Sequence, residues 1–346
     1  MRWLSLHHLD RNLPELGGLV LLAAALFLAS AAGMSYVAGF HAVWDLLRHP
    51  VWWWLPVSVA AVAASFVGYY FAYRGIGKVE GGPDDLSTPD RLAVVTAGFG
   101  GFLAHGGQKL DLFALRAAGA SEREAHVRVV LIAGLEHGLL TVPGTAAAIA
   151  ALAQGLKRPP KDFTIPWAVG PAIGFAIAFW AASRYRDRLR DRDGWRGKTG
   201  VLLDAIHLIG VMFRRPLAHA PALLGMVFFW ISDMFALWAA MQAFGFRMNG
   251  AGVVIAFGTA MIVTRRTGPL GGAGILMCAL PPTLWQCGAP WPAAVAGTIA
   301  WRFFTLWLPM PLSFAAIPRL RALGGRAEHR PAEGAERREE EPALPS

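Results

Sequence analysis

The chain alternates long apolar stretches with short polar segments. Six apolar stretches recur, at about 17–37, 51–73, 121–155, 165–183, 217–244 and 291–316. A helix of ~20 apolar residues crosses a bilayer core of ~30 Å, so each stretch is long enough to span a membrane. The pattern predicts an all-α polytopic membrane protein with about six transmembrane helices.

Two further apolar stretches are broken by glycine and are too short to cross as straight helices. They cover residues 92–118 and 251–286, and the second contains the glycine-rich run from Arg265 to Met277. Non-helical backbone at membrane depth is tolerated only where protein or water satisfies its polar groups. We therefore predict two re-entrant hairpins, each beside an internal site.

The order of elements is repeated in the two halves of the chain. In each half, an amphipathic segment follows the first span, at 41–50 and at 199–213. The sequence Gly119-Ala120-Ser121 after the first hairpin corresponds to Gly288-Ala289-Pro290 after the second. Three spans per half is an odd number, so the second half is expected to face the other way, as in transporters with inverted repeats. The predicted organisation is an interfacial segment at 1–16, membrane halves at 17–155 and 156–318, and a disordered tail at 319–346.

Composition and charge narrow the class of protein. Of 346 residues, 55% are hydrophobic and 16% charged, with a net charge of +9. The basic residues lie between the apolar stretches, most densely at 184–198, which is typical of cytoplasmic loops and not of nucleic-acid binding. We therefore expect cytoplasmic N- and C-termini. Cys278 and Cys287 support neither a disulfide framework nor a metal site, and no cofactor is indicated.

Candidate chemistry gathers around the hairpins and the last span. Arginine binds phosphate oxygens in a bidentate manner, and glycines let backbone N–H groups approach the same anion. The predicted lipid-headgroup site consists of Arg265, Arg266, Gly271, Gly272, Gly274, Arg302, His105, Gln108, Lys109 and Arg116. Two alternatives are open: Arg265 and Arg266 as interfacial anchors, and Lys109, Asp111 and Arg116 as the solvated face of a hairpin arm.

Ionisable residues inside predicted spans are a second signal, because charge at membrane depth is costly and usually functional. Glu136 and His137 form either a proton relay or an internal pair with an arginine. Asp233 is a candidate partner of Arg302.

Several of these motifs resemble a known family. The run Pro269 to Met277, followed by Gly288 and Arg302, is similar to the signature of the lysylphosphatidylglycerol synthase transmembrane family. The motif of Gly119, Ser121, Glu124 and Ala125 is similar to its first half, and the likeness covers most of residues 14–318.

This resemblance implies a multi-pass protein of the bacterial inner membrane that moves aminoacylated phosphatidylglycerol or polyprenyl-linked lipids. The family usually has an acidic residue where this chain has Met277, and a Glu-Arg pair where it has Ile132 and Ala133. Those departures put the usual charge pairing, and with it transport, in question.

The leading functional hypothesis is a lipid flippase whose partners are membrane phospholipids. One alternative is an intramembrane transferase using a polyprenyl-phosphate donor, but its nearest carboxylates, Asp84, Asp85 and Asp90, sit in a glycine- and proline-containing link. Another is a scaffold for a separate lipid-modifying enzyme. Since bifunctional family members carry a soluble synthase domain that does not follow here, we expect no enzymatic activity.

Overall fold

The computed structural model describes residues 13–82, 86–100, 107–190, 192, 194–264 and 273–329. These residues form helices and connecting segments, with no strand among them. Five helices are long and apolar enough to cross a membrane, and a bent pair near the C-terminus provides a sixth span if it is counted as one. The predicted all-α polytopic class is confirmed.

The long helices follow the predicted spans closely. They are α1 (Leu13–Ala38), α3 (Trp54–Gly77), α6 (Glu122–Ala153), α7 (Lys161–Leu189) and α9 (Ala220–Ala243). The sixth span is built from α13 (Trp291–Arg302), the π-helical turn η4 (Phe303–Trp307) and α14 (Met310–Ala315), and it bends by 56° into α15 (Ile317–His329). Helix α6 begins as its sequence predicts, because the Ser121 hydroxyl accepts a hydrogen bond from the Glu124 backbone N–H at 3.3 Å.

Shorter helices occupy the remaining predicted elements. The amphipathic segments form α2 (Phe40–Arg48) and α8 (Gly194–Arg214), and the two glycine-broken stretches form the pairs α4 (Thr88–Gly100) with α5 (Gly107–Ala117) and α10 (Gly250–Thr264) with α12 (Ile275–Gln286). The helices of each pair pack against each other. The turns that join them lie outside the described residues, and re-entry into the membrane stays a prediction.

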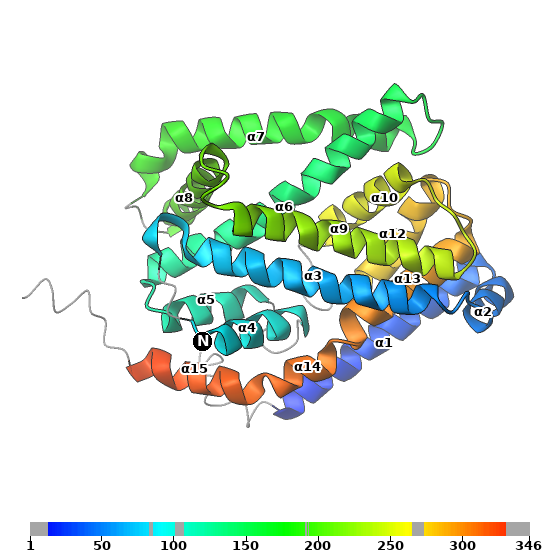
Figure 1. Cartoon of the computed structure of the whole chain (residues 1–346), viewed down its shortest axis with the longest axis horizontal. Helices are drawn as coiled ribbons and strands as arrows, with labels where there is room; N and C mark the ends of the chain where they lie inside the picture. Colours follow the sequence, from blue (N-terminus) through cyan, green and yellow to red (C-terminus); the bar gives the residue numbers. More distant parts are fainter. Residues whose placement is uncertain are drawn as a thin grey trace, which may run out of the picture.

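Two helices extend beyond the boundaries expected from the sequence. Helix α1 already begins at Leu13, so the end of the predicted interfacial segment belongs to the first long helix. Helix α15 continues to His329, so the first part of the predicted disordered tail is helical. Figure 1 shows α14 and α15 beside α4 and α5, and this packing explains why the polar sequence after residue 319 is ordered.

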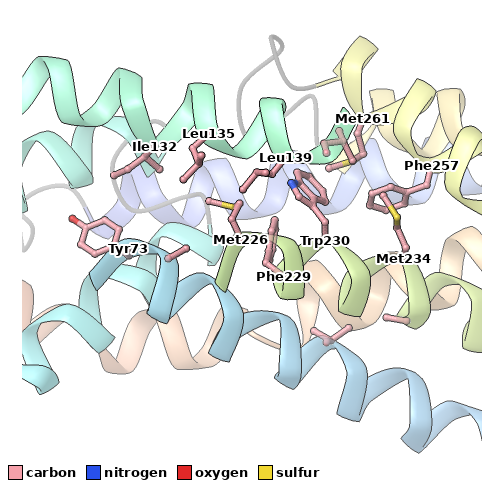
Figure 2. Close-up of a cluster of buried hydrophobic side chains, with 14 of the residues drawn as sticks. Tyr73, Ile132, Leu135, Leu139, Met226, Phe229, Trp230, Met234, Phe257 and Met261 are labelled. Carbon is pink, nitrogen blue, oxygen red and sulfur yellow. The ribbon is translucent and has the colours of Figure 1, made fainter. Parts of the chain in front are cut away.

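The interior is centred on α9, which packs along α3 on one side and against α6 on the other. Figure 2 shows Ile132 and Leu139 of α6 opposite Met226 and Trp230 of α9. The Trp230 side chain is fully buried, and its indole N–H donates to the Glu136 backbone oxygen at 2.7 Å. This contact fixes the position of α6 along α9. It therefore also fixes where Glu136 of α6 lies relative to α9.

Candidate polar cavity between the two halves

A cavity of about 290 Å³ lies between helices of both predicted halves. Its walls come from α3, α4, α5 and α6 of the first half and from α9, α10, α13 and η4 of the second. Its polar and titratable lining residues are Ser65, Tyr69, Asp111, Glu136, His137, Asp233, Arg302 and Thr305. Ionisable side chains distant in sequence therefore share one internal space.

Arg302 lies where the last span changes its helical geometry. It is the final residue of α13, and the next turn, η4, is π-helical. Its Nη1 donates to the Thr305 hydroxyl at 3.4 Å, and its guanidinium carbon lies 5.7 Å from the centre of the Trp301 ring. Single π-helical turns inside α-helices occur frequently at functional sites. Here the turn places both Arg302 and Thr305 on the cavity wall.

Asp233 projects from α9 into the same space. Its side chain is 7% exposed, and Oδ1 accepts a hydrogen bond from the Trp301 indole N–H at 3.0 Å. Trp301 immediately precedes Arg302, so this bond connects α9 to the helix that carries the arginine. The predicted partners Asp233 and Arg302 thus line one cavity.

Glu136 and His137 come from the middle of α6, and both line the cavity. The His137 Nδ1 lies 2.6 Å from the Ala133 backbone oxygen. A carbonyl oxygen only accepts hydrogen bonds, so Nδ1 is the donor in this contact. Both open hypotheses for this pair, proton relay and internal ion pairing, are compatible with this placement.

Sequence reasoning missed Asp111, which it left on the possible solvated face of a hairpin arm. The Asp111 side chain is 7% exposed and lines the cavity from α5. Helix α5 is outside the candidate spans. Burial, together with the nearby Glu136 charge as the smaller cause, raises the pKa of the Asp111 carboxyl to about 8. The missed signal was the spacing of Leu110, Ala114 and Ala118, which marks the buried side of this helix and adjoins Asp111.

The family comparison agrees with this architecture. The family model described as Lysylphosphatidylglycerol synthase TM region matches residues 16–313, which is most of the chain. This chain belongs to the lysylphosphatidylglycerol synthase transmembrane family. A search of curated proteins gives no match.

One of the two departures expected from the family resemblance falls on the cavity. Ile132 and Ala133, where the resemblance implies a Glu-Arg pair, both line it. Glu136 lies four residues after Ile132 and therefore on the same face of α6, one turn along. Met277, where the resemblance implies an acidic residue, is fully buried in α12 and is not part of the lining.

Other predicted site residues of this family member lie elsewhere or outside the described part. Arg116 is exposed and does not line the cavity, and Gly274 caps α12 against Leu26 and Ser30 of α1, where an added Cβ would lie 3.4 Å from each. His105, Arg265, Arg266, Gly271 and Gly272 lie outside the described residues, as do the side chains of Gln108 and Lys109. The described candidates that come together are thus Glu136, His137, Asp233 and Arg302.

Proposed function

We propose that this protein is a lipid flippase that moves a phospholipid between leaflets by admitting its headgroup to the polar cavity. The observation that carries the proposal is the placement of Arg302 with three carboxyl groups in one cavity between the two predicted halves. An isolated ion in an apolar medium costs on the order of 20 kcal/mol by idealised Born estimates, so a translocation path needs compensating groups at depth. The cavity supplies them.

The charge of the wall favours a headgroup that carries both a phosphate and an amine. Arg302 offers a planar fork suited to phosphate oxygens. Glu136 and Asp233 are acceptors suited to an ammonium group, and among the described lining residues they outnumber the arginine. An aminoacylated phosphatidylglycerol has both groups. We therefore propose this class before a polyprenyl-linked lipid, and we propose transport without covalent chemistry.

We further propose that both termini face the cytoplasm of a bacterial inner membrane. The support is the basic segment at 184–198, which covers the end of α7 and the start of α8, together with the basic residues before α1 and after α14. Excess lysine and arginine mark cytoplasmic loops. Reporter fusions test this orientation, because a fluorescent protein at the C-terminus should fold there and a phosphatase should stay inactive.

A reconstitution experiment tests the flippase. Vesicles with headgroup-labelled fluorescent phospholipid are treated with dithionite, which bleaches only the outer leaflet, and protein should speed the loss of the protected fraction. Replacing Arg302 by glutamine should slow this loss about tenfold or more, because a hydrogen bond to a charged group is worth about 1.5–3 kcal/mol.

The matched control is Arg188→Gln, which removes an exposed arginine of α7 far from the cavity lining. It should leave the rate unchanged. Equal rates in protein-free and protein-containing vesicles, with both an aminoacylated and an unmodified phosphatidylglycerol, would overturn the proposal.

A further inference from the structure

A second, apolar groove lies beside the polar cavity. It has a volume of about 590 Å³ and runs between α3 and α4 on one side and η4, α14 and the start of α15 on the other. Its lining is almost entirely aliphatic or aromatic, with Thr96 and Arg319 as its polar residues. Exposed Leu92 and Leu312 form part of opposite walls.

The groove and the cavity share a wall. Val62 and Phe66 of α3 line both spaces. Across from them, the π-helical turn divides its residues between the two spaces, because Thr305 lines the cavity and Phe304 lines the groove. The polar cavity and the apolar groove are therefore adjacent.

We propose that the groove is a binding site for one acyl chain of the lipid whose headgroup enters the polar cavity. This inference rests on the proposed flippase function. Acyl chains surround the whole protein in a bilayer, so burial of apolar area gives the groove little affinity of its own. Its contribution is close packing along a fixed path, which orients the attached headgroup toward Arg302.

Two polar contacts hold the walls of the groove together. The Arg319 Nε donates to the Asp90 carboxylate at 2.6 Å, joining α15 to the start of α4. The Ser313 hydroxyl donates to the Thr96 backbone oxygen at 2.9 Å, joining α14 to the middle of α4. Asp90 is completely buried, so its ion pair is shielded from water on the carboxylate side. These contacts set the spacing of the walls and hence the width available to a chain.

Photolabelling of the reconstituted full chain tests the site. The probe is a phosphatidylglycerol with a diazirine near the end of one acyl chain, and labelled peptides are mapped by mass spectrometry. We expect adducts on Leu92 and Leu312 to exceed those on Ile173 and Ile177, which are exposed residues of α7 outside the groove. Equal labelling of both sets would overturn the proposal.

Variants that fill the groove are the decisive part of the photolabelling experiment. Ala63 and Ala315 are exposed small residues on opposite walls, and each is replaced by tryptophan in a separate variant. Either change should lower groove labelling about fivefold or more, because an indole takes the space of the chain. Ala146→Trp, at an exposed position of α6 outside the groove, is the control and should change nothing.

The outcomes separate this inference from the flippase proposal. If Arg302→Gln stops transport but groove labelling is not enriched or not blocked by tryptophan, the acyl-chain site is wrong and the flippase stands. If labelling is enriched and blocked while wild-type protein moves no lipid, the site stands and the flippase is wrong. If the tryptophan variants instead dissociate an oligomer in nanodiscs, the groove is a protein interface and the acyl-chain site is wrong.

Discussion

Helices α7 and α9 are both long apolar spans of similar mean hydropathy, yet they differ in how the protein uses them. In the most apolar window of α9, 67% of residues are buried inside the protein, whereas in α7 only 11% are. Figure 1 shows α7 along one edge of the molecule, while α9 lies among other helices. Apolar length thus selects the segments that enter the membrane, but it does not select those that meet closely.

Small residues make the difference along the seam between α3 and α9. A Cβ added at Gly68 would lie 2.6 Å from the Phe229 backbone nitrogen, and one at Gly225 would lie 2.6 Å from the Ala72 backbone nitrogen. Lipid tails are as apolar as leucine, so helix association in membranes depends on such close packing. Since α3 carries Tyr69 and α9 carries Asp233, the seam also fixes two walls of the polar cavity.

The largest effect is expected when the seam is opened by Gly225→Leu. Its side chain would meet backbone atoms of α3 that cannot move separately from the helix, so we expect a cost above ~3 kcal/mol and loss of most folded protein. Fluorescence-detected size-exclusion chromatography in detergent would measure the folded fraction. Gly174→Leu, on α7, is the control because nothing lies within 4 Å of its added Cβ. A normal, monodisperse peak for Gly225→Leu would refute the importance of the seam.

The seam also shows which parts of the fold the sequence predicted. The spans follow from apolar length and the start of α6 follows from Ser121, because both are local properties. The contact between Gly68 and Gly225 could not be predicted, because glycine is common throughout the apolar stretches and only the fold decides which ones meet. For the same reason the sequence could not show that Gly170 and Gly174 of α7 face open space.

The cavity likewise contains residues that the sequence predicted and one that it did not. Glu136, Asp233 and Arg302 were candidates because charge inside a span is costly, and all three line it. Asp111 was missed because α5 is short and only its packing against α4 and α6 turns the carboxyl inward. Arg116 lies on a different side of α5 and is exposed, because the packing that turns Asp111 inward leaves that side uncovered.

A smaller effect is expected at the attachment of α7. Trp167 packs against α6 and α10, where a Cβ added at Gly258 would lie 2.7 Å from its ring, and its indole N–H donates to the Thr259 hydroxyl at 2.9 Å. Trp167→Ala should cost about 2–3 kcal/mol, less than in a water-soluble core because lipid can enter the vacated space. Thermal unfolding in one detergent would measure it. Trp180→Ala, which removes a 60% exposed indole of the same helix, should change the unfolding temperature far less, and equal shifts would contradict the comparison.

The smallest effect is expected at the polar end of α7, where Asp204 of α8 joins three helices. Its carboxylate accepts from Arg123 of α6 at 2.8 Å and from Arg186 of α7 at 2.9 Å. The Arg123 and Arg186 side chains are 38% and 25% exposed, so solvent screens both pairs, and Asp204→Asn should cost about 0.5–1 kcal/mol. The loss should shrink as salt is raised, because screening already weakens the pairs of the wild type.

Unfolding temperatures at low and high salt, with the exposed Asp187→Asn as control, separate this contribution from packing. A loss independent of salt would mean that Asp204 acts through burial and not through its charge. In that case the polar end of α7 would be held in the same way as the α3–α9 seam, and the contrast between the two regions would be confined to their apolar faces.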